Sequence, residues 1–330
     1  MFKSIKMIMP SAAVFAATLA FGLANSAQAT TVLKFAHVYD ESTPYHKVLL
    51  EAAKEIKART DDRYEMQVFP SSSLGNEESI NEGLSLGTVD LIYTGPAFMA
   101  QSYPEIGLID YPFVFRNYDH WEAFWKSDLR DEMAKGYHDA TGNVLITHTY
   151  YGTRQVTANK PILKPADMKG LKIRVPNAPA YTLFPRAVGA NPTPMAFSEV
   201  YLGLQQGVVD AQENPLPTIK AGQFYEVQSD ISLTSHTIAT LTTLMSGTTY
   251  DNIDDADRKV IVGILRDASA TATKEVRDQE TSLVQWFKDQ GVKVHDVDRQ
   301  PFMDIVQPLL KGKDMPWSPE TFERLQAIGK

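Results

Sequence analysis

The stretch that decides the fold lies between Tyr150 and Pro215 and contains YYGTRQVTANK (150–160), GLKIRVPNAPA (170–180) and TPMAFSEVYLGLQQGVVDAQENP (193–215). Arg154 and Arg174 each lie in a short run of residues typical of a β-strand. Arg174 has apolar neighbours, so we expect its strand to be largely buried; they are Leu171, Ile173 and Val175. A guanidinium in that setting needs an anion, since an unpaired buried charge is costly.

Two kinds of anion can meet this need. A carboxylate of the same chain is the common partner of a buried arginine. A ligand carboxylate is the other, because the planar fork of arginine grips it through two parallel hydrogen bonds. The residues around Arg174 alone leave both alternatives open.

A short pattern occurs twice in the chain. GLSLGTVD (83–90) matches GLQQGVVD (203–210), and each copy reads as a helix end, a glycine stop, the start of a strand and an aspartate. A proline follows each copy within six residues. The repeat predicts two similar lobes. Because ligands of open α/β sheets bind beyond the carboxyl ends of the strands, we expect Thr94 and Asn214 to face one another across a cleft.

Strand-like and helical segments alternate along the chain. Strands are expected at 31–38, 64–69 and 89–93, with helices beginning at Pro44 and near Asn76. This alternation predicts an open, mainly parallel sheet with helices on both faces. Segments 143–158 and 231–247 read as crossings between the lobes. A helical pattern from about 256 to 290 exceeds the usual length of a globular helix and predicts one long helix packed across both lobes.

Composition and the first residues predict an exported protein. The chain has 330 residues, of which 43% are hydrophobic and 22% charged, with a net charge of −8 and no cysteine. That length allows two domains, and the missing cysteines exclude disulfides and a cysteine-linked lipid anchor. Residues 1–29 have lysines, an apolar run and an Ala-Gln-Ala end, so we predict a signal peptide cleaved after Ala29 and a periplasmic product. The acidic balance argues against nucleic-acid binding.

Three motifs together resemble a known family. GTRQVT (152–157), KIRVPN (172–177) and QQGVVDAQENP (205–215) are similar to the DctP-type solute receptors of tripartite ATP-independent periplasmic (TRAP) transporters, and the resemblance runs from about residue 31 to about residue 310. It implies an α/β, type II-like periplasmic binding protein with a long helix spanning both lobes. We expect lobe I to comprise 30–151 and 240–279, and lobe II 152–239 and 280–330.

The resemblance also implies a function. We expect a monomeric receptor that closes around a small carboxylate and delivers it to a small and a large membrane permease subunit. The chain has no Walker loop, no G-x-S-x-G elbow and no metal-ligand spacing among its seven histidines. We therefore expect no enzyme activity, no metal and no cofactor.

The resemblance assigns roles to particular residues. Arg174 is expected to grip the ligand carboxylate, Arg154 to support it or reach a second oxygen, and Asn214 to donate its amide. Other expected ligand-binding residues are Asn177, Phe197, His37, Tyr93, Thr94, Tyr151 and Glu77. Three of these have plain structural alternatives: core packing for Phe197, a satisfied histidine at the end of a strand for His37, and a helix cap for Glu77.

The nature of the ligand stays open at this stage. One arginine expected to bind a carboxylate, Arg174, together with polar residues expected to line the pocket, suggests a hydroxylated acid such as a uronate, an aldonate or a sialate. A short C4-dicarboxylate is the alternative, with Arg154 taking its other end. A third possibility is a ligand sensor or an exported enzyme that uses the same closure.

Overall fold

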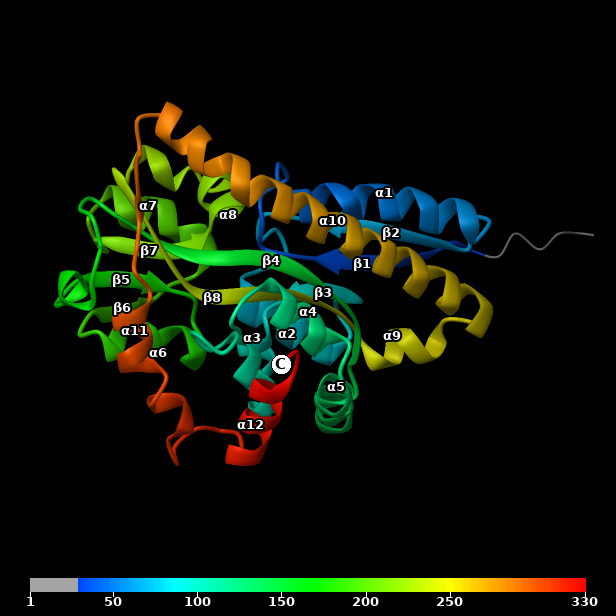
Figure 1. Ribbon diagram of the computed structural model, residues 1–330. Helices are drawn as coiled ribbons and strands as arrows, with labels where there is room; N and C mark the ends of the chain where they lie inside the picture. Colours follow the sequence, from blue (N-terminus) through cyan, green and yellow to red (C-terminus); the bar gives the residue numbers. More distant parts are fainter. Residues whose placement is uncertain (1–28) are drawn as a thin grey trace, which may run out of the picture.

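A single sheet connects the whole molecule (Figure 1). The computed structural model describes residues 29–330, so the predicted signal peptide lies outside the described residues except for its last residue. Within that range nine strands follow the order β2-β1-β3-β8-β4-β7-β5-β6, and β9 pairs with β8. Their bounds are β1 Thr31–Ala36, β2 Tyr64–Phe69, β3 Leu91–Thr94, β4 Val144–Ala158, β5 Lys172–Val175, β6 Asn191–Pro194, β7 Ala211–Pro215, β8 Asp230–Met245 and β9 Lys293–Asp296.

Two long antiparallel strands join two parallel groups. β1 pairs in parallel with β2 and β3, and β5 pairs in parallel with β6 and β7. Between these groups β4 and β8, of 15 and 16 residues, pair antiparallel along most of their length. β8 pairs with β3 near its end and β4 pairs with β7 near its end. The predicted mainly parallel sheet with two crossings is confirmed, and the return crossing is the single strand β8.

Helices cover both faces of this sheet. Their bounds are α1 Pro44–Arg59, α2 Glu77–Leu86, α3 Pro96–Met99, α4 Tyr118–Trp125, α5 Asp128–Thr141, α6 Pro179–Ala187, α7 Val200–Gln205, α8 Leu216–Ala221, α9 Gly247–Asn252, α10 Asp255–Asp289, α11 Gln300–Val306 and α12 Pro319–Ala327. Short 3₁₀ helices occur at Pro104–Asp110, Pro165–Met168, Phe197–Glu199, Phe224–Glu226 and Leu309–Lys311. No helix among residues 29–330 has both the length and the apolar character needed to cross a membrane.

The predicted long helix is confirmed. α10 has 35 residues and contacts α1 in one half of the molecule, α8 and β9 in the other, and the crossing strand β4. Figure 1 shows it running obliquely along one side of the whole molecule. Its buried residues recur at helical spacing, among them Ile261, Leu265, Ala272 and Val276. One continuous helix therefore packs on both halves.

The apolar core is divided in the same way. One large cluster fills the half that contains β1 to β3, with Phe35, Leu91 and Trp121 at its centre. Two smaller clusters fill the other half, one around Ile173 and one around Phe287. Each half therefore has a core of its own, as expected for two similar lobes.

The repeated pattern forms the same structure twice. α2 and α7 each end just before a glycine with positive φ, Gly87 at 72° and Gly207 at 70°. The following aspartate then accepts a hydrogen bond from the backbone of the neighbouring parallel strand. Asp90 Oδ2 accepts from Lys34 N at 2.8 Å, and Asp210 Oδ2 accepts from Lys172 N at 3.0 Å. The two halves are therefore built on one local plan.

Gly152 lies at a bend of the crossing strand β4, and it supplies a test of that geometry. The pairing of β4 with β8 shifts register between Tyr150 and Gly152, and the φ of Gly152 is +118°. A Cβ added there would lie 2.7 Å from Pro215 Cβ. We predict that Gly152→Ala lowers the free energy of unfolding by about 1–3 kcal/mol, as measured by urea denaturation.

Gly263 is the matched control for this prediction. It lies inside α10, and a Cβ added there meets nothing within 4 Å. Gly263→Ala should raise the free energy of unfolding by about 0.5–1 kcal/mol, because alanine loses less backbone entropy in a helix. Equal stability of the two alanine variants would contradict the assigned backbone geometry of β4.

Candidate ligand-binding site

A small cavity lies between the two halves of the molecule. Its lining comes from both halves and comprises Tyr39, Glu77, Gly95, Phe98, Tyr151, Arg154, Arg174, Pro176, Tyr181, Phe197, Asn214, Thr240 and Leu241. About half of these residues lie at or just beyond the carboxyl ends of β1, β3, β5 and β7, where α/β sheets place their ligands, and four more lie on the crossing strands β4 and β8. The cavity measures about 20 Å³, which is room for about one water molecule.

Arg174 brings a buried cation to this cavity. Its side chain is 1% exposed and donates two hydrogen bonds to Met195 O, from Nε at 3.0 Å and from Nη2 at 2.7 Å. Among residues 29–330 no carboxylate oxygen lies within 4.0 Å of its guanidinium. Burial lowers the pKa of Arg174, and the charge of Glu77 opposes that change. Arginine stays protonated in proteins, so a positive charge remains here without an adjacent counter-charge.

Arg154 differs, because the chain itself neutralises it. Its Nε donates to Glu213 Oε2, and its Nη2 donates to Glu213 Oε1 at 2.8 Å and to Asn214 Oδ1 at 3.2 Å. His236 Nε2 lies 3.1 Å from Glu213 Oε2. Burial alone would raise the pKa of Glu213, but the charge of Arg154 and the hydrogen bonds from His236 and Arg154 lower it to about 2. The charge of Arg154 is therefore neutralised by Glu213 at the edge of the cavity.

Aromatic rings fill much of the space around the two arginines. Tyr39 contacts both Tyr151 and Phe197, with ring centroids 5.3 and 6.1 Å apart. Arg174 Cζ lies 6.0 Å from the Phe197 centroid, and Arg154 Cζ lies 5.0 Å from the Tyr181 centroid. Tyrosine presents an apolar ring together with a hydroxyl, so this wall can contact both the carbon skeleton and the polar groups of a ligand.

Glu77, at the start of α2, is the one carboxylate among the residues that line the cavity. It is the first residue of α2, and the cap of that helix is Asn76, whose side chain accepts from Ser79 N at 3.0 Å. Burial raises the pKa of Glu77, and the charge of Arg174 opposes the increase. The capping role considered for Glu77 therefore belongs to its neighbour, and Glu77 faces the cavity.

Hydrogen bonds across the cleft hold the halves together. Tyr181 Oη donates to Asp110 Oδ2 at 3.0 Å, and Asn177 Nδ2 donates to Glu78 Oε1. Burial, more than any other influence, raises the pKa of Asp110 to about 6. Because the cavity holds about one water molecule, a larger ligand can enter only if these contacts open. The structure is therefore a closed form.

Six of the ten residues expected at the site meet in the cavity: Arg174, Arg154, Asn214, Phe197, Tyr151 and Glu77. Asn177 lines an adjacent cavity of about 250 Å³ that shares Glu77 and Phe98 with the first. For these seven residues the ligand-binding role stays a prediction.

Three expected residues do not line the cavity in this structure, so for them as well the ligand-binding role stays a prediction. His37 is 1% exposed and bonds to His46 at 3.0 Å, which is the satisfied histidine considered as its alternative. Tyr93 packs edge-on against Phe35, and Thr94 Oγ1 accepts from Asn81 Nδ2 at 2.9 Å. These three side chains lie next to the lining rather than in it, and Asn214 lines the cavity whereas Thr94 does not.

Sequence reasoning missed several residues of the site. Tyr39, Phe98 and Tyr181 line the cavity, and Glu213 neutralises Arg154. A signal for Glu213 exists in the QEN run before Pro215. Arg154 pairs with Pro215 in the register of β4 and β7, which places Glu213 diagonally opposite Arg154 on the same face. That register could not be read from the sequence.

The arrangement can bind an anion, and the described residues contain no cluster of three or more His, Cys, Asp or Glu side chains that could hold a metal ion. The cation at Arg174 is fixed by Met195 and turned toward the cavity. Its fork suits a planar carboxylate.

The Arg154–Glu213 pair predicts a pH-dependent stability. Glu213→Gln leaves Arg154 buried without its counter-charge, so the variant should lose about 3–5 kcal/mol of unfolding free energy at neutral pH. The folded-state pKa of Glu213, about 2, lies below its ordinary value of 4.5. Its stabilisation is therefore present above pH 4.5 and lost as the pH falls through 2. Urea unfolding should show the gap to the unmodified protein narrowing over that window, and a gap independent of pH would contradict the assignment.

Comparison with known proteins agrees with this geometry. The profile of the bacterial extracellular solute-binding protein family 7 (DctP) matches residues 35–314. The sialic acid-binding periplasmic protein of Vibrio cholerae is 34% identical over 303 residues, covering 90% of this chain and 93% of the relative. The 2,3-diketo-L-gulonate-binding periplasmic protein of Escherichia coli is 30% identical over 318 residues, covering 96% of each chain.

A solved structure shows the same fold. The TRAP periplasmic solute-binding protein of Polaromonas sp. JS666, bound to D-erythronate, superposes with a TM-score of 0.86 at 33% identity, covering 91% of this chain and 99% of that one. The extent of these matches confirms the two-lobed fold and the resemblance carried by the three motifs. The chain belongs to the bacterial extracellular solute-binding proteins of family 7, the DctP family of TRAP receptors.

Proposed function

We propose that this protein is the periplasmic receptor of a TRAP transporter and that it binds a small hydroxylated carboxylate between its two lobes. The observation that carries the proposal is the buried guanidinium of Arg174, which has no carboxylate partner among residues 29–330 and borders the inter-lobe cavity. A ligand carboxylate would complete it with two parallel hydrogen bonds.

The two arginines favour one acidic group on the ligand rather than two. Arg154 is already held by Glu213, so a second ligand carboxylate would have to compete with an internal one. This disfavours the C4-dicarboxylate alternative. The tyrosine hydroxyls and Glu77 around the cavity can bond to ligand hydroxyl groups. The three relatives described above bind, by their names, sialic acid, 2,3-diketo-L-gulonate and D-erythronate, and each of these is a hydroxylated carboxylate.

Lobe closure supplies the mechanism. The ligand contacts residues of both halves only when they meet, so it favours the closed form through its extra contacts there. We expect the lobes to divide at 30–151 with 240–279 and at 152–239 with 280–330, linked by β4, β8 and α10. Membership of a solute-binding family also argues against the enzyme alternative. The closed receptor, a monomer exported after cleavage at Ala29, would then deliver the acid to membrane permease subunits.

A matched pair of substitutions separates a binding arginine from a structural one. Arg174→Met removes a buried charge that lacks an adjacent internal partner, so the ligand-free variant should stay within about 1 kcal/mol of the unmodified protein. Its affinity for the acid should nevertheless fall by about 10²–10³-fold. Arg154→Met leaves the buried Glu213 with His236 but without its arginine counter-charge and should cost about 3–5 kcal/mol of stability. Urea unfolding and titration calorimetry measure the two quantities.

The acid itself can be found by a thermal-shift screen of uronates, aldonates, sialate and C4-dicarboxylates, because only a ligand of the folded state raises the melting temperature by mass action. We expect a hydroxylated monocarboxylate to give the largest shift. Normal binding of that acid by Arg174→Met would contradict the proposed site, and turnover of the acid would contradict a receptor function.

A further inference from the structure

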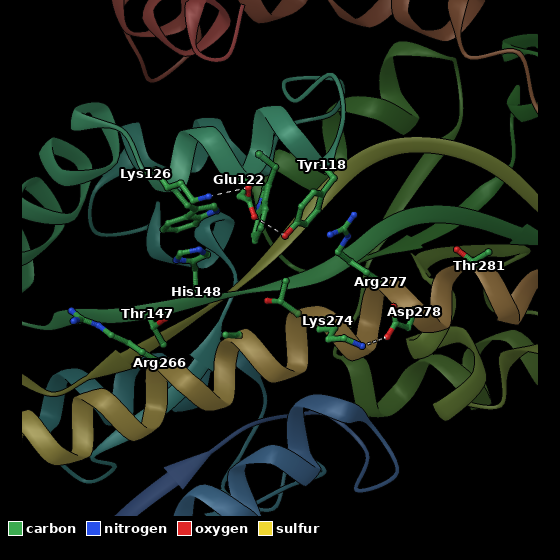
Figure 2. A pocket seen from close by; sticks show the side chains of 14 residues that line it. Tyr118, Glu122, Lys126, Thr147, His148, Arg266, Lys274, Arg277, Asp278 and Thr281 are labelled. Atoms are coloured by element: carbon green, nitrogen blue, oxygen red, sulfur yellow. Dashed lines mark hydrogen bonds and ion pairs between the residues drawn. The ribbon is translucent and has the colours of Figure 1, made fainter.

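A second cavity lies outside the cleft, between α4 and α10, with β4 as its floor. Its volume is about 710 Å³. Figure 2 shows Tyr118 on the α4 side, His148 on β4, and Arg266 and Arg277 on α10. We call this cavity the α4–α10 groove. The ligand-binding site shares no lining residue with it.

The groove carries two cations that form no ion pair within residues 29–330, although Glu122 and Glu280 lie near enough to Arg277 to interact with its charge. Two of its lysines are paired, Lys126 with Glu122 at 2.9 Å and Lys274 with Asp278 at 2.7 Å. For the two arginines, by contrast, the described part of the chain offers no carboxylate oxygen within 4.0 Å. The groove therefore has a net positive charge of two in a chain whose net charge is −8.

Both arginines are exposed and held in the groove by weak contacts. Arg277 Cζ lies 3.6 Å from the centroid of Tyr118, and Arg266 Nε donates to Ile146 O at 3.4 Å. These contacts orient the guanidinium groups without saturating them. Each retains donors for an incoming carboxylate.

The spacing of the arginines limits what can occupy the groove. They are 277 − 266 = 11 residues apart on one helix, which is close to three turns, so both lie on the same face at a separation of about 16 Å. Figure 2 places them at opposite ends of the groove. Between them Ala270 and Thr273 are short side chains that leave the middle open. About five residues of extended chain span that distance, at about 3.3 Å per residue, so a peptide segment can place one carboxylate at each arginine.

The floor and wall of the groove are also incompletely satisfied. Trp125 and His148 stack with centroids 4.1 Å apart. Within residues 29–330 neither Trp125 Nε1 nor His148 Nδ1 has a hydrogen-bond partner, although both atoms are buried. Buried polar atoms normally find partners. A groove with unpaired polar atoms, aromatic rings and free cations has the composition of a recognition surface rather than of a packed core.

The geometry points to a docking site for an acidic segment of the transporter's membrane permease, with one carboxylate on Arg266 and a second on Arg277. The identity of this partner rests on the proposed function, while its chemistry follows from charge complementarity with the groove. Docking here would place the partner on α10, the helix that packs on both lobes.

Site-directed photocrosslinking tests the proposal. Ala270 is exposed at the middle of the groove and can be replaced by benzoylphenylalanine in the full mature chain. Illumination with membranes of the source bacterium should crosslink the receptor to a permease subunit, within a segment that contains two acidic residues. Arg266→Glu with Arg277→Glu should reduce the yield by about tenfold or more, because like charges would then face each other.

A control variant has the same change in net charge. Lys311→Glu with Lys313→Glu alters two exposed lysines outside the groove and should leave the crosslink unchanged. Persistence of the crosslink in the arginine variant would overturn the proposal, and so would a crosslink to a second copy of the chain, to a soluble protein or to nothing.

A measurement of ligand binding distinguishes a wrong docking proposal from a wrong proposed function. The arginine double variant should keep the thermal shift given by acids that stabilise the unmodified protein, since the groove and the cleft have no lining residue in common. Loss of that shift would mean that the groove acts through the fold, and the docking proposal would be wrong. If no organic acid stabilises the unmodified protein, the proposed function fails, whatever the crosslink shows.

Discussion

The structure depends on a difference between two buried arginines. Glu213 neutralises Arg154 within the second half of the sheet, and that pair links β4 to β7. Arg174 has only a carbonyl oxygen, Met195 O, as its hydrogen-bond acceptor and has no carboxylate within 4.0 Å among the described residues. Because an uncompensated buried charge is costly, a ligand carboxylate that bonds to Arg174 would stabilise the complex.

The architecture allows the two halves to close around an anion bound at Arg174. β4 and β8 join two parallel groups of strands, and α10 packs on both, so the halves can move as bodies around a few shared elements. The cavity lining comes from both halves, and Asp110–Tyr181 and Glu78–Asn177 contacts connect them at its edge. In this closed form a ligand would be surrounded on all sides. Under the proposed function, binding and closure are one event, because the contacts that hold the ligand exist only when the halves meet.

Much of the fold could be predicted from residue patterns. The repeated G-L-x-x-G-x-V-D pattern indicated two similar halves, and the uninterrupted helical pattern after Ala256 indicated α10, because both signals are local. The site was predictable in part. Arg174, Arg154 and Asn214 carry the recognisable motifs, but the capture of Arg154 by Glu213 depends on strand register, and the contribution of Tyr39 and Tyr181 depends on how the halves meet. His37 and Thr94 lie near the ends of strands, as expected, and their side chains hydrogen-bond to His46 and Asn81 of the same half.

The most direct test of the central claim is a crystal structure of the mature protein with its acid bound. The account predicts that both oxygens of the ligand carboxylate contact the guanidinium of Arg174, that Arg154 remains paired with Glu213, and that the lobes are closed around the ligand. A carboxylate bound elsewhere in the cleft, with Arg174 paired to Glu77 or to another side chain of the protein, would contradict it.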